Sequence, residues 1–312
     1  MKKKKILVFG SFVADLMSRG PHLPSPGETV LCSLFQMGPG GKGFNQGVAA
    51  HKAGGDVTMV TKIGRDAFGD LARSTMQSLG MDTAHLLVSD TVGTGAALVF
   101  VDENTSQNMI GITPGACATI TEEDLCALEP ILAQCSYLLM QMEVNLDANW
   151  RLLRLAKQYG VMTILNTAPA QPLPEEIYRQ LDMVTPNEVE AEVLTGIPVA
   201  DEAGAQKAAQ ALLAKGVQNV VITLGSRGVF VATAEASALI PVPRVAVLDT
   251  TGAGDAFNGG LVTALSEGKD LFAAARFANA LAAVSVQRMG TTRSMPTREE
   301  IDDFIAAHPE LA

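Results

Sequence analysis

The chain has 312 residues, which is enough for one large α/β domain or for two ordinary ones. Hydrophobic residues make up 47% of it and charged residues 18%, so we expect a sizeable packed core and little disorder. The formal net charge of −10 argues against nucleic-acid or anionic-membrane partners, which need a basic face. ATP is not excluded, because local backbone N–H groups and a few cations can hold phosphates.

The N-terminal segment begins like a signal peptide, with lysines before the apolar run Ile6–Phe9. That run stops after four residues, and Asp15 stands where the apolar region would have to continue. No window approaches the ~18 uninterrupted apolar residues of a membrane span. We therefore expect a cytoplasmic protein.

The four cysteines show no spacing typical of a metal or redox motif. Cys32, Cys117, Cys126 and Cys135 form no Cys-x-x-Cys pair and have no histidine nearby. In a large chain rich in core residues, scattered cysteines of this kind are usually buried free thiols, and we expect that here.

The first 115 residues contain two kinds of predicted strand. Ile6–Phe9 and Val57–Ile63 suit a core sheet, whereas three half-exposed segments are Thr29–Phe35, Ala96–Val101 and Asn108–Ile112. The last two would pair across the polar turn at 102–104, as an antiparallel patch inserted between core strands. This patch is either a lid over an active site or an ordinary edge extension of the sheet, and the pattern leaves both open.

From about residue 130 to 290, predicted strands and helices alternate. The strands are Tyr137–Met140, Val161–Leu165 and Val220–Thr223, and the clearest helices are Asn149–Tyr159 and Glu202–Lys215. This order predicts a doubly wound α/β fold, with a mostly parallel central sheet and helices on both faces. Ligands of such folds bind at the carboxyl ends of the strands. No repeat or linker divides the chain.

The strongest motif is a predicted strand, Val245–Asp249, that continues into Thr250-Thr251-Gly252-Ala253-Gly254-Asp255 and a helix through Leu265. The glycines allow close approach of a ligand, and N–H groups at a helix start form an anion hole. Asp255 has two interpretations. It is either a carboxylate favoured by the helix dipole, or the base that accepts a hydroxyl proton during phosphoryl transfer.

The second motif, Gly38–Gln46, is a glycine-rich loop that precedes a predicted helix at Val48–Ala53. A dinucleotide fingerprint is excluded because the loop does not end the first strand and no carboxylate follows ~20 residues later. A Walker A loop is excluded because Gly43, rather than Ser or Thr, follows Lys42. With both motifs excluded, the loop still offers backbone N–H groups, a cation and an amide. These groups suit a polyhydroxylated ligand or its phosphorylated product.

Three further segments lie at predicted strand ends. Asn187 and Glu190 could orient Mg²⁺ or its waters, but the residues alone favour a helix capping box. Thr223–Gly228 is either a tight turn or a loop that contacts a nucleotide. Glu143 follows the strand Tyr137–Met140 and would also project at a carboxyl end.

Together these motifs resemble the ribokinase family of carbohydrate kinases, over essentially the whole chain. Gly40-Gly41-Lys42-Gly43-x-Asn45-Gln46 matches the family's N-terminal signature, and the 249–255 segment matches its C-terminal one. Asn187-x-x-Glu190 lies between them. The resemblance implies one α/β kinase domain over 1–312, with a β-sheet lid formed from roughly 12–37 and 92–113. It also implies a homodimer through the lid.

The resemblance implies transfer of the ATP γ-phosphoryl group to the 5-hydroxyl of ribose or a closely related pentose. Asp255 would be the base, with Gly252, Ala253 and Gly254 as the anion hole. Sugar contacts would come from Asp15, Gly40, Gly41, Lys42, Asn45, Glu143 and Asp255. Nucleotide positions would be Asn187, Thr223, Gly225, Ser226, Gly228, Gly254 and Asn279. Asn187 and Glu190 would act through Mg²⁺, and K⁺ would be held at Asp249, Thr251, Ser285, Arg288, Gly290 and Ser294.

Two residues depart from the family pattern. Val13 stands where the family presents an Asn to the sugar, and Phe44 replaces a usual Ala. A site without that polar group discriminates less against a substrate that lacks the matching hydroxyl. The alternatives are therefore a kinase of 2-deoxyribose, a nucleoside or another ketose or keto-sugar acid, a neutral packing change, and a non-catalytic sensor of sugar or nucleotide on the same fold.

Overall fold

The computed structural model describes residues 4–105 and 107–311. Within them the central sheet has eight strands in the order β14-β13-β12-β11-β10-β9-β1-β4. The strands from β12 to β4 are parallel, and β13 and β14 add an antiparallel edge. The bounds are β1 Ile6–Phe9, β4 Val57–Val60, β9 Tyr137–Met140, β10 Met162–Leu165, β11 Met183–Val184, β12 Asn219–Thr223, β13 Val229–Thr233 and β14 Ser237–Ile240.

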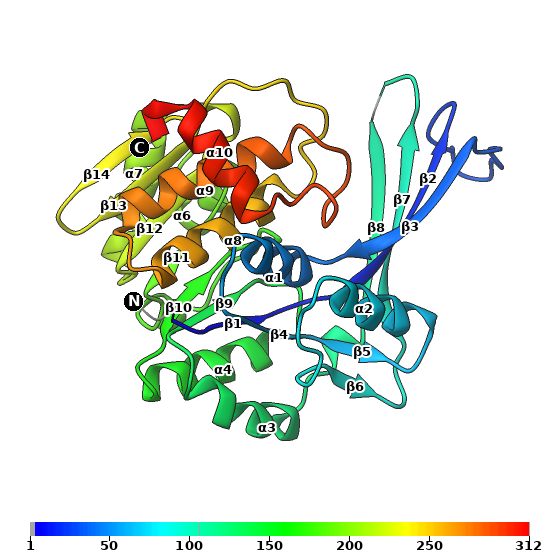
Figure 1. Ribbon diagram of the computed structural model, residues 1–312, viewed down its shortest axis with the longest axis horizontal. Helices are drawn as coiled ribbons and strands as arrows, with labels where there is room; N and C mark the ends of the chain where they lie inside the picture. Colours follow the sequence, from blue (N-terminus) through cyan, green and yellow to red (C-terminus); the bar gives the residue numbers. More distant parts are fainter. Residues whose placement is uncertain (1–3, 106, 312) are drawn as a thin grey trace.

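Helices cover both faces of this sheet (Figure 1). Along β1, Leu7 and Phe9 pack into one hydrophobic cluster with α3 and α4, whereas Ile6 and Val8 pack into the other with α1, α8 and α9. This alternation explains why β1 is apolar at every position. The helices are α1 Lys42–Lys52, α2 Ala67–Ser78, α3 Glu122–Leu132, α4 Leu146–Gln158, α5 Glu175–Tyr178, α6 Glu188–Thr195, α7 Glu202–Ala214, α8 Ala253–Ser266, α9 Leu271–Ser285 and α10 Arg298–Ala307, with 3₁₀ turns η1 Ala116–Ala118, η2 Gly225–Arg227 and η3 Pro309–Leu311.

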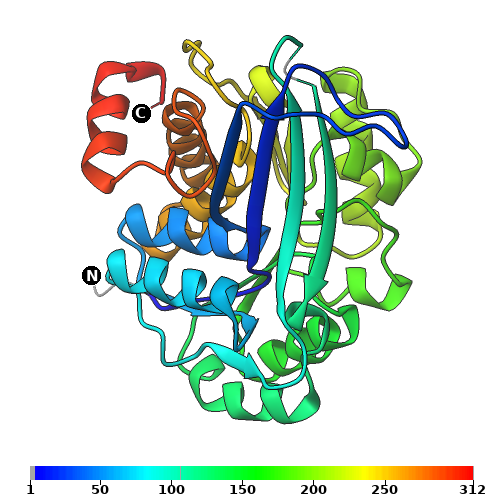
Figure 2. The same cartoon turned by 90° about the vertical axis from the view of Figure 1, so that its right-hand side faces the viewer.

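A second sheet projects from the body as a lid (Figures 1 and 2). Its order is β3-β2-β7-β8, with bounds β2 Val13–Gly20, β3 Leu34–Gly40, β7 Thr94–Asp102 and β8 Asn108–Gly115. The lid interpretation is thus confirmed over the edge extension, and so is the predicted pairing, in which Ala97 lies opposite Ile112. The sheet is not wholly antiparallel, however, because its central strands β2 and β7 run parallel.

Several predicted boundaries are wrong. The strand expected at Thr29–Phe35 begins only at Leu34 and runs through the Gly-Pro-Gly segment, which composition alone marked as a loop. The strand expected at Val57–Ile63 divides into β4 and β5 (Lys62–Gly64), because β5 leaves the central sheet to pair with β6 (Leu87–Ser89). The helix expected from Val48 begins at Lys42, since Gly41, with φ of 93°, turns the chain directly into α1.

The apolar segment Val245–Asp249 is not a strand. The central sheet ends at β14, and the segment instead crosses over the α9 end, where the Leu248 and Asp249 amides donate to the Val286 carbonyl at 2.8 and 3.1 Å. Its Val247 and Leu248 side chains are exposed. The cysteine prediction is half wrong as well: Cys117 and Cys135 are buried, but Cys32 and Cys126 are exposed. Across the described residues, every helix is too short or too polar to cross a bilayer.

Candidate active site

Asp255 lies in the first turn of α8, at the carboxyl edge of the central sheet. Gly252 caps this helix with φ of 78°, a left-handed conformation that glycine adopts without strain. Among the described residues, the N–H groups of Gly252, Gly254 and Asp255 have no protein acceptor, whereas the Ala253 N–H donates to the Thr250 carbonyl at 3.1 Å. Of the three predicted anion-hole residues, Ala253 therefore has its N–H already engaged, and the Gly252 and Gly254 N–H groups are free to hold an anion.

The Asp255 carboxylate is held by two amides from α1. Asn45 donates from Nδ2 to Oδ2 at 3.1 Å, and Gln46 donates from Nε2 to Oδ1 at 3.0 Å. Burial raises the pKa of Asp255, and the nearby Lys42 charge and these two hydrogen bonds oppose that rise without cancelling it. A buried carboxylate with a raised pKa and free lone pairs is suited to accept a proton.

Lys42 is the cation at the centre of this site. Burial lowers the pKa of its ammonium, but the carboxylates of Asp255, Glu143 and Glu190 outweigh burial, so the net pKa is raised and Lys42 stays charged. Asp15, on β2, has its pKa raised to about 6 by burial and by the negative charges of Glu143 and Asp255. The site therefore concentrates carboxylates around one half-buried cation.

Glu143 connects the glycine-rich loop Gly38–Gln46 to the residues after β1. Its Oε2 accepts from Ser11 Oγ at 2.5 Å and from the Lys42 backbone N–H at 2.9 Å. The Asp15 carboxylate lies so close to Gly40 that a Cβ there would stand 2.3 Å from both carboxylate oxygens. The structure thus brings the predicted sugar-binding residues together, between the lid and α1.

A cavity of about 190 Å³ extends from Asp255 toward the strand ends. It joins the start of α8 to loops after β10, β11 and β12. Its lining residues are Lys42, Asn166, Ala168, Thr185, Asn187, Glu190, Thr223, Thr250, Gly252, Ala253, Gly254, Asp255 and Asn258. Free N–H groups at one end and polar side chains along its wall make it suitable for a phosphorylated ligand.

Asn187 and Glu190 form the capping box that their spacing predicts. The Asn187 side chain accepts from the Glu190 N–H at 2.8 Å, and Glu190 Oε2 accepts from the Asn187 N–H at 3.0 Å. Glu190 Oε1 also accepts from Asn187 Nδ2 at 2.9 Å. Both residues nevertheless line the cavity. In the described part of the chain, no group of three or more acidic, histidine or cysteine side chains is placed to hold a metal ion directly, so the donor set fits Mg²⁺ held largely through water.

The remaining predicted nucleotide residues are divided between two places. Thr223 lines the cavity and forms a bridge with Asn187. Gly225 and Ser226 lie in the tight turn η2 and Gly228 caps it, all three outside the cavity lining. Asn279, on α9, is also outside it and donates to the Ile240 and Pro241 carbonyls, at 3.2 Å each.

Asp249 joins two loops beside the start of α8. Its carboxylate accepts from the Thr251 N–H and the Gly290 N–H, both at 2.9 Å, and these bonds outweigh burial and lower its pKa. Across residues 4–105 and 107–311, the backbone carbonyls of Asp249, Thr251, Arg288 and Gly290 accept no backbone hydrogen bond. Ser285 and Ser294 have hydroxyls bonded to nearby carbonyls. Free carbonyl oxygens around a carboxylate-braced loop fit a weakly hydrated monovalent cation.

Sequence reasoning assigned no role to several polar residues of the site. Asn166 and Thr185 directly follow β10 and β11, and both line the cavity with Asn258. Ser11 follows β1 closely and donates to Glu143. Their position after parallel strands was a usable signal, because carboxyl ends of neighbouring strands meet at one edge. Gln46 was part of the recognised motif, but its bond to Asp255 depends on how α1 crosses α8.

The two residues that depart from the family pattern lie in different surroundings. Val13 pairs with Gly40 at the foot of the lid and shares a sheet face with Asp15, two residues on. Phe44 is fully buried and packs edge-on against Phe12, with ring centroids 5.0 Å apart. Val13 is buried on the Asp15 face of the lid, whereas Phe44 belongs to the core of the body.

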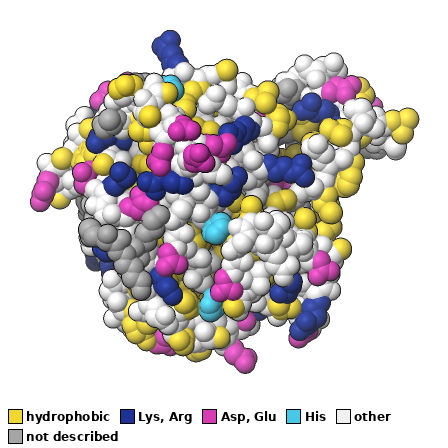
Figure 3. Space-filling model, viewed as in Figure 1, with side chains coloured by type: hydrophobic (Ala, Val, Ile, Leu, Met, Phe, Trp, Pro, Cys, Tyr) yellow, Lys and Arg dark blue, Asp and Glu magenta, His cyan; other side chains and the backbone are white. Residues whose placement is uncertain are grey.

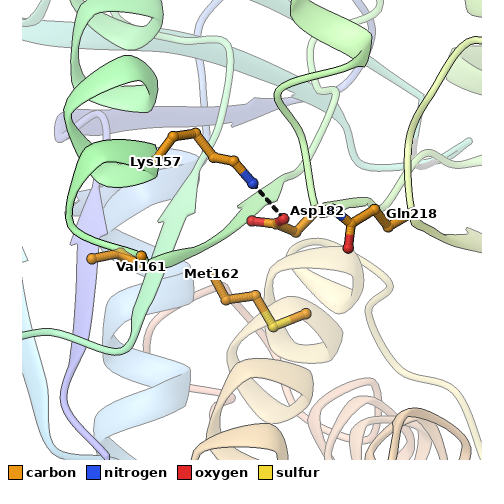
Figure 4. A pocket seen from close by; sticks show the side chains of 6 residues that line it. Lys157, Val161, Met162, Asp182 and Gln218 are labelled. Carbon is orange, nitrogen blue, oxygen red and sulfur yellow. Dashed lines mark hydrogen bonds and ion pairs between the residues drawn. The ribbon is translucent and has the colours of Figure 1, made fainter.

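A second cavity, of about 230 Å³, lies at the opposite, amino ends of β10, β11 and β12 (Figure 4). There Lys157 pairs with Asp182 at 2.6 Å, and the other Asp182 oxygen accepts from the Thr163 hydroxyl at 2.9 Å. The charged groups satisfy each other, so this cavity has a structural explanation.

Comparison with known proteins agrees with this geometry. Residues 3–298 match the model of the pfkB family of carbohydrate kinases. The chain is 42% identical to a ribokinase of Haemophilus influenzae over 97% of this chain and 99% of that protein. It is 35% identical to a deoxyribokinase of Salmonella typhimurium, over 96% and 98% respectively.

Solved structures give the same result. A ribokinase of Thermotoga maritima superposes with a TM-score of 0.88 at 37% identity, covering 97% of this chain and 99% of the other. An Arabidopsis thaliana ribokinase, solved with ribose and ATP, gives a TM-score of 0.90 at 30% identity, with 98% and 99% coverage. Fold and site thus define a carbohydrate kinase. The chain belongs to the pfkB family, and the likeness to ribokinases predicted from its motifs is confirmed.

Proposed function

We propose that this protein transfers the γ-phosphoryl group of ATP to the primary 5-hydroxyl of ribose or a closely related pentose. The support comes from the ribokinase relatives, one of which was solved with ribose and ATP, and from the two-sided arrangement around Asp255. On one side lie the polar groups below the lid, and on the other lies the cavity at the start of α8.

The position of Asp255 between these two sides is the observation that carries the proposal. Its carboxylate takes the proton of the sugar hydroxyl, and the oxygen forms a bond to the γ-phosphorus as the bond to the ADP oxygen breaks. The free N–H groups of Gly252 and Gly254 stabilise negative charge on the moving phosphoryl group, and Lys42 adds a fixed positive charge.

Replacement of the base tests this assignment. Asp255→Asn keeps the size of the side chain and should lower kcat for ribose by ~10²–10⁴ in an assay coupled to ADP release. Asp270→Asn is the matched control, because Asp270 caps α9 away from the site and Asn caps equally well. Wild-type turnover by Asp255→Asn would refute the assignment. ATP binding by the wild type without turnover on any sugar would instead indicate a sensor.

Bound metal ions would supply charge that the chain lacks. Asn187 and Glu190 would orient the waters of Mg²⁺ on the nucleotide phosphates. The carbonyls near Asp249 and Gly290 would hold K⁺ beside the start of α8. In both places, the role of this chain's residues is to fix the position of phosphates and N–H groups before the reaction begins.

Val13 supports a second candidate substrate, 2-deoxyribose. Its apolar side chain shares a face with Asp15, and one relative is a deoxyribokinase. If Val13 faces C2 of the sugar, Val13→Asn should raise the ratio of kcat/KM for ribose to that for 2-deoxyribose by ~10-fold or more. Val13→Ala controls for lost packing and should leave the ratio unchanged. An equal ratio in Val13→Asn would exclude this position from sugar selection.

We further propose that residues 1–312 act as one kinase domain, with the lid closing over the sugar, and that two chains associate through their lids. An enzyme of this kind would act in the cytoplasm, where ATP is abundant.

A further inference from the structure

A chain of buried amides is attached to the Asp255 carboxylate through Gln46 of α1. Gln46 Nε2 donates to Asp255 Oδ1 and also to Asn166 Oδ1, at 3.0 Å each. Gln141 Nε2 donates to Gln46 Oε1 at 2.7 Å, and Asn149 Nδ2 donates to the Gln141 backbone carbonyl at 2.6 Å. Gln46, Gln141 and Asn149 are all fully buried, so water does not compete for these bonds.

The orientations of the Gln46 and Gln141 amides follow from Asp255. An ionised carboxylate only accepts hydrogen bonds, so the Gln46 amide nitrogen must face Asp255. Both of its hydrogens are then used, on Asp255 and Asn166, and Gln46 Oε1 can only accept. The Gln141 nitrogen must therefore face Gln46. Asp255 therefore fixes the directions of the Gln46 and Gln141 amides, whereas the Asn149 amide is oriented by the Gln141 backbone carbonyl, which can only accept.

This arrangement leaves polar atoms without partners. Of the three buried side-chain atoms that lack a hydrogen bond in the described part of the chain, two are Gln141 Oε1 and Asn149 Oδ1. Gln141 Oε1 is pressed against Gly10, where a Cβ would stand only 1.9 Å from it. Unpartnered buried acceptors are costly and rare, and their concentration in one network calls for a reason beyond stability.

We infer that Gln46 is a positioning residue for Asp255, and that Gln141 acts through Gln46 by fixing the direction of its amide. This inference rests on the proposed role of Asp255 as the base. Gln46 fixes the rotation of the carboxylate through Oδ1, so that its remaining lone pairs face the hydroxyl of the sugar. It also stabilises the ionised form, which is the form that can accept the proton.

Removal of the Gln46 donor changes the balance of charges at Asp255. Four other charged groups act on this carboxylate: Lys42 of α1 favours its ionised form, and Asp15 of β2, Glu143 after β9 and Glu190 of α6 oppose it. Burial raises the pKa of Asp255, and the Gln46 bond is one of the contributions that lower it. Without that bond the pKa of Asp255 should be higher, and the acid limb of the pH profile of kcat should move to higher pH.

The test is the pH profile of kcat at saturating sugar and ATP for Gln46→Met and Gln141→Met, which keep side-chain length but cannot donate. Gln46→Met should lower kcat ~10-fold near neutral pH, shift the acid limb upward and recover activity at high pH. Gln141→Met should shift the acid limb in the same direction, but by less. The double variant should match Gln46→Met alone, because Gln141 acts only through Gln46.

Thr163→Val is the matched control, because it removes a buried hydrogen bond to Asp182 at the opposite ends of the strands. It should lower the melting temperature without moving the profile. A folded Gln46→Met with an unshifted profile would overturn the inference, and if that variant does not fold, the profile of Gln141→Met decides. Asp255→Asn separates the two proposals. If it turns over like wild type, the base assignment fails and this inference with it, whereas an inactive Asp255→Asn beside an unshifted Gln46→Met refutes only the positioning role.

Discussion

Opposing charge effects at single residues dominate the site. Glu143, Glu190 and Asp255 act on Lys42, and Asp15 is coupled to Glu143 and Asp255. Burial raises the pKa of Asp15, Glu190 and Asp255. Such an arrangement costs folding free energy, because carboxylates lose water and repel each other. We propose that a bound sugar offsets this cost, because its hydroxyls offer donors to these oxygens.

Replacement of Asp15 measures both the cost of its carboxylate to stability and its contribution to sugar binding. Its pKa is about 6 in the folded chain and ~3.9 when unfolded, so above about pH 6 the folded state bears the cost of ionisation. Asp15→Asn should raise the melting temperature at pH 7 by roughly 2–4 °C and raise the KM for sugar by ~10–100-fold. Below about pH 4, where Asp15 is protonated in both states, the difference in melting temperature should vanish. A variant that is less stable at pH 7 would contradict the assignment of this cost to Asp15.

At the scale of elements, two helix starts build the site. Both α1 and α8 follow a glycine with a positive φ, Gly41 and Gly252, and each presents its first turn to the other. The extra six residues at the start of α1, compared with the predicted helix, are the ones that reach Glu143 and Asp255.

Gly41→Ala should damage the site more than the fold. A Cβ at Gly41 would stand 2.9 Å from the Ser11 carbonyl and 3.0 Å from the Val13 nitrogen, which would displace the start of α1. We expect the KM for sugar to rise ~10-fold or more, together with a lower melting temperature. Gly80→Ala is the control, because Gly80 has φ of 71° but nothing within 4 Å of its added Cβ. Equal sugar KM values in the two variants would show that the position of α1 is not critical.

At the scale of the whole molecule, the lid leaves an apolar face without a covering. Register places Leu16, Met37 and Leu98 in one row, and Phe35, Phe100 and Met109 in the next, on the face opposite Asp15. Hydrophobic side chains gather along the lid in Figure 3, and Figure 2 shows the sheet face-on with the body behind it. A second copy of the chain is the covering we propose, since a dimer would bury two such faces together.

Leu98→Lys tests the dimer, because Leu98 is 64% exposed in the centre of this face. We expect the wild type to sediment with twice the mass of one chain and Leu98→Lys to sediment as a monomer. Leu31→Lys is the control: Leu31 is 90% exposed but lies in the β2–β3 loop, off the sheet. A wild type that sediments as a monomer, or a Leu98→Lys variant that remains a dimer, would count against the lid as the interface.

The sequence by itself determined the α/β class, the family and most of the chemistry-bearing residues. Buried parallel strands are apolar on both faces, as in Ile6–Phe9, and glycines at helix starts are required for close approach, so both leave local marks. The capping box of Asn187 and Glu190 was equally local and was predicted correctly.

Only the tertiary structure decided which residues meet. Val245–Asp249 has the composition of a strand but finds no neighbouring strand, because pairing is decided by the rest of the sheet. Gln141 lies in no motif, and although Gln46 does, its bond to Asp255 joins residues 209 positions apart. Contacts of that range are set by how α1 packs on α8, which no local pattern records.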